Sequence, residues 1–181
     1  VETWQIAEFA MPPPKNKLES VCDAILQKYK NHNAGLFIYG DATSQKEDVK
    51  LEKGHNLFHL IKNKLAVLHP QLKLSRSNPS VVMRGEFLNY CFATEKTIKI
   101  RIDKSCIATI NDLNGTQKDK NGGKDKAMVT VKGMRYQKYG HLSDAMDYFL
   151  CKAWESEYNR FVRGGKDATF YVGTIIKNNR R

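Results

Sequence analysis

GLFIYGDAT, residues 35–43, is an apolar run that ends in a glycine and an aspartate. Leu36 to Tyr39 are apolar at successive positions, which is typical of a central strand buried on both faces. Apolar residues at helical spacing predict one helix over 17–30, before this strand, and a second over 55–68, after it. Strands that alternate with helices of this length are typical of an α/β fold with parallel connections.

The rest of the chain continues the alternation. We expect further strands at 4–11, 72–76, 97–103 (or an extended segment covering the core) and 168–176, and further helices at 79–93, 105–113 and 142–160. Asn78 is expected to cap the helix that Pro79 opens. Residues 114–126 are polar and lysine-rich, and 127–136 regain strand character, so a basic surface loop and hairpin are predicted within 114–138.

The composition bounds the class of protein. A chain of 181 residues is long enough for one domain with a hydrophobic core, and its net charge of +11 favours a polyanionic partner, nucleic acid before an anionic membrane. No run approaches the roughly 18 apolar residues of a membrane span, and no signal peptide is evident. The cysteines are scattered among apolar residues, so we expect reduced core thiols of an intracellular protein: Cys22, Cys91, Cys106 and Cys151.

The segment GHLSDAMDY, residues 140–148, places two acids on one side of the last predicted helix. Asp144 and Asp147 lie about one turn apart, so their carboxylates point roughly the same way. Two like charges on one face cost free energy unless a cation lies beside them, which predicts a bound cation. Ser143 or Asp144 could instead cap the helix, and His141 is either an outer-shell group, a proton carrier or a structural histidine.

Asp41 is the second candidate acid, because ligands of open α/β sheets bind at the carboxyl ends of strands. Its plainer interpretation is a turn or helix cap. Carboxylates from Asp41 and Asp144 would suit hard divalent ions, two of which can clamp a phosphodiester during its displacement. Glu86 and Asp112 are expected to form structural hydrogen bonds, and Arg84 to orient a carboxylate or contact DNA.

With these residues identified, the chain resembles the nuclease domain of a tailed-phage terminase large subunit. LFIYGDATS resembles the strand whose end supplies the second acid of that family. SNPSVVMRGEFLN (77–89), followed by IATINDL, resembles the middle of one phage subgroup. HLSDAMDY is similar to the closing pattern H-x-x-D-A-x-x-Y of the family, which makes Asp144 the expected metal ligand and Asp147 a bystander or an outer contributor.

The resemblance implies a ribonuclease H-like mixed sheet flanked by helices, with a core at about 4–160 and an extension at 161–181. It also implies that Asp41 and Asp144 help to hold two Mg²⁺ or Mn²⁺ ions. The first acid of the family lies on a first strand that we expect upstream of this chain, so the chain is expected to be a weakly active fragment that also lacks the ATPase motor. Alternatively Asp41 lies on the first strand, and Glu8 is a further ligand or, more simply, a structural residue.

The activity implied is that of a two-metal-ion endodeoxyribonuclease that cuts concatemeric double-stranded DNA during phage genome packaging in the cytoplasm of the bacterial host. Implied partners are the terminase ATPase domain, the small terminase subunit and the portal. Backbone contacts to DNA are expected from a set of basic residues, unless these are only solvated: Lys118, Lys120, Lys124, Lys126, Arg135 and Lys138. Alternatives are a resolvase or integrase-type nuclease, and a non-catalytic or degenerate ribonuclease H-like DNA-binding module.

Overall fold

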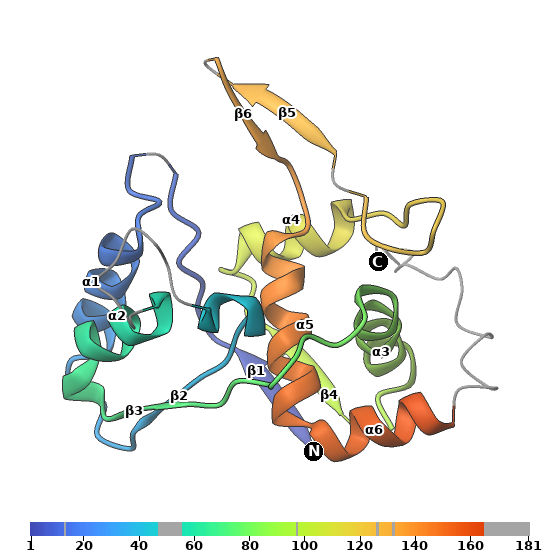
Figure 1. Cartoon of the computed structure of the whole chain (residues 1–181), viewed down its shortest axis with the longest axis horizontal. Coiled ribbons are helices and arrows are strands. Elements are labelled where there is room, and N and C mark those ends of the chain that lie inside the picture. Colours follow the sequence, from blue (N-terminus) through green and yellow to red (C-terminus); the bar gives the residue numbers. More distant parts are fainter. Residues whose placement is uncertain (13, 47–55, 97, 126, 132, 165–181) are drawn as a thin grey trace. The chain divides into compact units, whose positions relative to one another are not determined.

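The structure is a computed structural model that describes residues 1–12, 14–46, 56–96, 98–125, 127–131 and 133–164. The chain forms two compact units (Figure 1): the first contains Val1–Glu8 and the chain from Pro79 onward, and the second contains Phe9–Asn78. The existence of a single domain over the whole chain stays a prediction. Across the described ranges, no helix combines the length and the apolar composition that crossing a lipid bilayer requires.

The described part of the first unit combines a parallel strand pair, a hairpin and four helices. Its elements are β1 (Glu2–Gln5), α3 (Val81–Thr94), β4 (Lys99–Ile102), α4 (Ile107–Gly115), β5 (Met128–Val131), β6 (Met134–Gln137), α5 (His141–Ala153) and α6 (Glu155–Arg163). β1 pairs with β4 in parallel, with Thr3 opposite Ile100. β5 and β6 pair antiparallel, and the turn between them uses Gly133 at a φ of +77°, which glycine adopts without strain.

The hydrophobic core of the first unit lies where α3 and α5 pack together with β4. Its buried members are Phe87, Leu88, Cys91, Ile98, Ile100, Leu150 and Cys151. Burial raises the pKa of the Cys91 and Cys151 thiols to about 12, so both stay protonated. All four cysteines of the chain are buried and free of disulfides, which confirms the prediction of reduced core thiols.

Two expectations for the first unit are wrong in their boundaries. The first strand is Glu2–Gln5 instead of 4–11. The ladder between β1 and β4 ends with a hydrogen bond from the Asp103 amide to the Gln5 carbonyl, and the residues after Asp103 lead into α4. The helix expected over 142–160 is interrupted at Trp154 and becomes α5 and α6. There the Trp154 indole nitrogen donates to Thr3 Oγ1 at 3.0 Å, which ties the break to β1.

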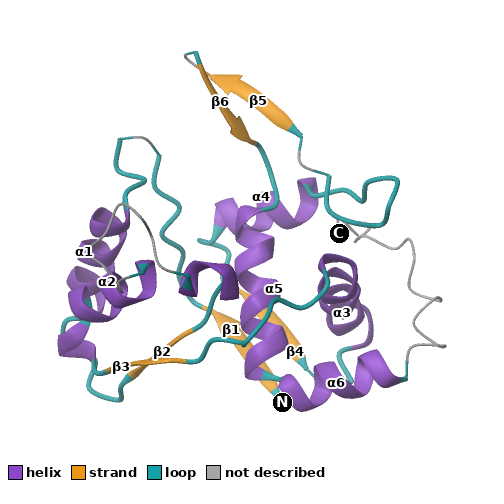
Figure 2. Cartoon of the chain, viewed as in Figure 1, coloured by secondary structure: helices purple, strands orange, loops and turns teal. Residues whose placement is uncertain are grey.

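The second unit contains α1 (Leu18–Tyr29), β2 (Leu36–Ile38), the 3-10 helix η1 (Ala42–Gln45), α2 (Leu57–Lys64), the 3-10 helix η2 (Ala66–Leu68) and β3 (Pro70–Leu72). β2 and β3 pair in parallel (Figure 2), with Phe37 opposite Gln71. Among the residues described in this unit, the buried side chains are Cys22, Ala42, Phe58, Leu65 and Leu68. At the end of β2, a Cβ on Gly40 would lie 2.9 Å from the Phe58 ring, so only glycine allows this approach.

Three further details differ from expectation, two in the second unit and one at the start of α3 in the first. β3 begins at Pro70 and ends at Leu72, so the strand expected at 72–76 starts earlier and is shorter. β2 is not buried on both faces, because Phe37 is 56% exposed and Lys73 lies 4.9 Å from the centre of its ring. Helix α3 is capped by Ser80, without a side-chain bond, instead of Asn78, and begins at Val81.

The α/β class and its parallel connections are confirmed by the two parallel strand pairs. The expected fold has one mixed sheet. The described strands instead form three separate two-stranded sheets. The helix expected over 55–68 corresponds to α2 and η2, its first residue lying outside the described range. The strand expected at 168–176 also lies outside the described residues.

Candidate functional site

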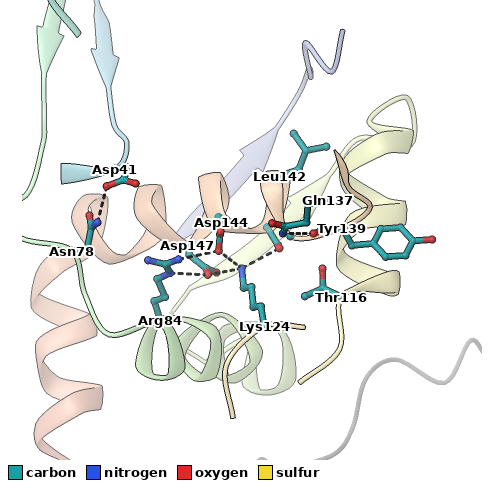
Figure 3. Close-up of polar contacts among 12 residues, drawn as sticks. Asp41, Asn78, Arg84, Thr116, Lys124, Gln137, Tyr139, Leu142, Asp144 and Asp147 are labelled. Atoms are coloured by element: carbon teal, nitrogen blue, oxygen red, sulfur yellow. Dashed lines mark hydrogen bonds and ion pairs between the residues drawn. The ribbon is translucent and has the colours of Figure 1, made fainter. Parts of the chain in front are cut away.

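Helix α5 carries the acid pair that the sequence singled out, and two basic side chains lie against it (Figure 3). The Asp144 side chain is 27% exposed, whereas that of Asp147 is completely buried. Arg84 approaches from α3, and Lys124 approaches from the loop between α4 and β5. The cations that the two adjacent carboxylates require are therefore, within the described residues, side chains of the protein itself.

Lys124 lies between the two carboxylates. Its Nζ is 3.0 Å from Asp144 Oδ1 and 2.7 Å from Asp147 Oδ2. It also donates to Ser143 Oγ at 3.0 Å, so three oxygen atoms match the three protons of the ammonium. The side chain is only 11% exposed, and this lysine is an internal counter-ion in the structure.

Arg84, on helix α3, contacts the same two carboxylates, Asp144 and Asp147. Its Nη2 donates to Asp144 Oδ1 at 3.0 Å, and its Nε lies 3.4 Å from Asp147 Oδ2. The guanidinium also stacks at 4.4 Å from the centre of the Tyr148 ring. Burial lowers the pKa of Arg84, but the nearby Asp144, Tyr148 and Asp147 outweigh it and raise the pKa overall. Of the two roles left open for Arg84, orientation of a carboxylate is the one present in the structure.

The two carboxylates differ in how their oxygen atoms are used. Burial raises the pKa of Asp147 to about 6, although Lys124 and Arg84 both oppose that shift. Among the described residues, Asp147 Oδ1 is buried without a hydrogen-bond partner. Both ionic contacts of the partly exposed Asp144 go to Oδ1. Asp144 Oδ2 therefore lies outside these ion pairs on a partly exposed side chain, whereas Asp147 Oδ1 is enclosed by the protein.

Asp112 of α4 fixes the start of α5. Its carboxylate accepts hydrogen bonds from the backbone amides of Gly140, Leu142 and Ser143, at 3.0 to 3.4 Å. Burial would raise the pKa of Asp112, but these amide donors lower it overall. A structural role for Asp112 is thus confirmed, and the expectation that Ser143 or Asp144 caps α5 is wrong, because the cap position is Gly140 at a φ of +105°.

Two further acids, Glu8 and Glu86, also have structural contacts within the first unit. Glu8 accepts from the backbone amides of Ala108 and Thr109, both at 2.8 Å, and so caps the first turn of α4. Glu86 forms an ion pair with Lys118. His141 is exposed at the first position of α5.

In the second unit, Asp41 follows β2 and caps η1. Its Oδ1 accepts from the Thr43 amide and hydroxyl, each at 2.7 Å, and from Asn78 Nδ2 at 2.6 Å. Asn78 in turn accepts from the Ala42 amide at 2.8 Å. The cap interpretation of Asp41 is confirmed, and the same bonds fix the direction of its carboxylate. That Asp41 and Asp144 share a cation stays a prediction.

The basic residues expected to contact DNA have different environments. Lys120 and Arg135 are exposed, and exposed Lys138 lies 4.9 Å from the centre of the Tyr139 ring. Lys118 and Lys124 are engaged by acids of the first unit. Lys126 lies outside the described residues.

Sequence reasoning missed two groups that position the acids. Asn78 was expected to cap α3, and no local pattern links it to Asp41, which precedes it by 37 positions. Lys124 was not distinguished from its neighbours, because all lysines of the loop share the same polar surroundings in sequence. In the described part of the chain, no three His, Cys, Asp or Glu side chains are grouped as metal ligands.

Comparison of the chain with protein-family models, with curated proteins and with solved structures gave no significant match.

Proposed function

We propose that the chain is a metal-dependent endonuclease domain of the terminase large-subunit type, acting on double-stranded DNA. The observation that carries the proposal is the acid pair of α5, in which Asp144 is partly exposed and each carboxylate keeps one oxygen atom outside its ion pairs. The pair lies within HLSDAMDY, the segment that is most similar to the terminase pattern. The finer fold proposed is ribonuclease H-like, and the two parallel strand pairs support it.

The donor set fits a hard divalent cation, because Mg²⁺ and Mn²⁺ prefer carboxylate oxygens. Asp144 and Asp41 would hold the ions, with Asp147 contributing from the buried side. When bound, such ions activate a water molecule and stabilise the leaving 3′ oxygen of a phosphodiester. The chain's own contribution is to orient these carboxylates. Arg84, which stacks on the Tyr148 ring, fixes Asp144, and Asn78 and Thr43 fix Asp41.

DNA binding is proposed to use the backbone phosphates without reading the base sequence. The net charge of +11 supports this, as do the exposed side chains of Lys120, Arg135 and Lys138. Sequence-independent binding suits the cutting of concatemeric DNA during genome packaging. By the same proposal, the partners are the terminase ATPase domain, the small subunit and the portal, in the cytoplasm of the bacterial host.

One observation favours a second candidate, a DNA-binding module without catalysis. Arg84 and Lys124 already supply two positive charges to the two carboxylates of α5, so the cluster is balanced by side chains alone. A buried ion-pair network of this kind can be purely structural.

A plasmid-nicking assay in Mn²⁺ separates the two candidates. The nuclease proposal expects weak nicking that is lost in Asp41→Asn and in Asp144→Asn, whereas Asp125→Asn, a change of an exposed loop aspartate, retains it. Duplex binding in EDTA should be unaffected by all three changes. Mn²⁺ titration by calorimetry should give binding that both site variants weaken. Duplex binding without nicking or Mn²⁺ binding would support the module and contradict the nuclease.

A further inference from the structure

The position of Lys124 between Asp144 and Asp147 is the position that a shared cation would take. We propose that Lys124 stands in for a divalent cation there, and that binding of the metal releases its ammonium to contact a DNA phosphate. The inference rests on the proposed function, because it requires that the α5 acid pair binds a metal. It adds that metal binding and DNA binding are coupled through one side chain.

The charges of the cluster make the exchange necessary. Two carboxylates face one guanidinium and one ammonium, so the cluster is close to neutral when both acids are ionised. A divalent ion would bring two more positive charges within a few ångströms of these cations. Like charges at that separation in a partly buried site repel strongly, so either the metal is excluded or one cation leaves.

Arg84 is held in place. Its side chain is 5% exposed and projects from the first turn of α3, where it contacts both acids and the Tyr148 ring. To leave, it would have to abandon a stacked, buried position that α3 and α5 form together. Its guanidinium is also the group that keeps Asp144 in position when the ammonium departs.

Lys124 can leave by rotation of its side chain alone. The backbone of its turn is closed by a hydrogen bond from the Asp119 amide to the Gly123 carbonyl at 2.9 Å. Asp119 Oδ1 also accepts from the amides of Asn121 and Gly123. Lys118 anchors the opposite strand of the turn on Glu86. The turn therefore keeps its conformation while a four-carbon side chain exchanges one set of oxygen partners for another.

A phosphate of the DNA backbone is the partner that suits the released ammonium. Phosphate oxygens are strong acceptors for lysine, and Lys120 on the same turn is already exposed. Binding of the metal frees the Lys124 ammonium to contact a phosphate, so DNA should bind more tightly when metal is bound. By linkage, metal should bind more tightly when DNA is bound. The same exchange would let Lys124, whose side chain is only 11% exposed in the structure, contact DNA once metal is bound.

The first test uses the unmodified chain. Lysines are acetylated with an N-hydroxysuccinimide ester, with and without Mn²⁺, and the rate at each lysine is measured by mass spectrometry of peptides. Without metal, Lys124 should react slowly and Lys120 quickly. With Mn²⁺ the rate at Lys124 should rise at least about tenfold, since its paired state must be more than nine-tenths populated to limit the reaction. Lys120 should not change, and Asp144→Asn should abolish the metal effect.

The second test removes the stand-in cation. Lys124→Met should bind Mn²⁺ about tenfold more tightly, because the metal no longer competes with an ammonium. It should lower the salt dependence of duplex binding by about one phosphate contact in Mn²⁺ but not in EDTA, whereas Lys120→Met lowers it in both.

The outcomes separate the two levels of the proposal. Absence of Mn²⁺ binding, measured by electron paramagnetic resonance, would overturn both the metal site and the exchange. Binding that Asp144→Asn removes, with Lys124 still unreactive in Mn²⁺, would overturn the exchange alone. Weaker Mn²⁺ binding by Lys124→Met would also overturn it, because Lys124 would then support the site instead of competing for it.

Discussion

Substitution of Arg84 by methionine tests whether the α5 acids depend on a buried counter-ion. The change keeps a long side chain but removes the contacts of 3.0 Å to Asp144 and 3.4 Å to Asp147. Removing one partner of a buried ion-pair network typically costs about 3–5 kcal/mol, because a buried charge is left uncompensated. Lys124 still offsets one of the two carboxylates, so we expect about 3 kcal/mol at pH 8.

The cost should depend on pH in a defined direction. The pKa of Asp147 is about 6 in the folded protein, above its ordinary value of 3.8, so folding is favoured by protonation and loses stability as the pH rises toward 6. Loss of Arg84 raises this pKa further, because one nearby positive charge is gone. Below pH 6 Asp147 is protonated in both proteins and the difference is smallest. Above pH 6 the difference grows by about 1.4 kcal/mol per pH unit, until the higher pKa is reached.

Urea unfolding followed by tryptophan fluorescence measures this cost in the relevant unit. Both tryptophans of the chain, Trp4 and Trp154, belong to the first unit, so the signal reports that unit. Arg101→Met is the matched control, since Arg101 pairs with Glu2 and Glu95 at the surface and its loss should leave stability near that of the wild type. Equal midpoints for the two variants at pH 8, or a difference that shrinks with rising pH, would refute the reasoning.

Three further changes test the supports of the site by the same unfolding assay. Asp112→Ala should destabilise the first unit by about 1–3 kcal/mol by leaving the amides at the start of α5 unpaired, whereas Asp112→Asn keeps one acceptor and should cost less; equal losses would contradict the capping role. In wild type, the stabilisation from Asp112 should disappear as the pH falls below 3.8 and through its lowered pKa. Glu8→Ala should cost about 1 kcal/mol through the lost cap of α4, and no change would exclude that cap. Gly140→Ala should cost at least about 1 kcal/mol, because φ is +105° and its Cβ would lie 2.5 Å from Gln137 Nε2; a neutral result would mean that α5 starts differently.

Local patterns were sufficient to predict most helices and the class of fold. The periodicity of apolar residues located α1, α3, α4 and the hairpin to within a few residues. It failed where a distant side chain decides the boundary. Glu8 leaves the first strand to cap α4, and Trp154 ends α5 by bonding to Thr3. Neither bond could be inferred from a window of sequence, because the partners lie 100 and 151 positions away.

The acid pair of α5 shows the same division. The spacing of Asp144 and Asp147 was enough to predict a cation beside them. The spacing could not show that the positive charges come from the side chains of Arg84 and Lys124, because their positions depend on how α3 and the loop after α4 pack on α5. Similarly, the end of an apolar strand predicted Asp41 as a fixed carboxylate, but its contact with Asn78 arises only in the folded chain.

Iron-directed cleavage of the backbone tests most directly the proposal that Asp41 and Asp144 bind the same metal ion. Fe²⁺ replaces Mg²⁺ in carboxylate sites and, with ascorbate and peroxide, cuts the chain close to where it is bound. We predict cuts beside both residues 41 and 144, suppressed together by excess Mg²⁺ and lost together in Asp144→Asn. Cuts beside residue 144 alone, unchanged in Asp41→Asn, would show that the two carboxylates do not share an ion.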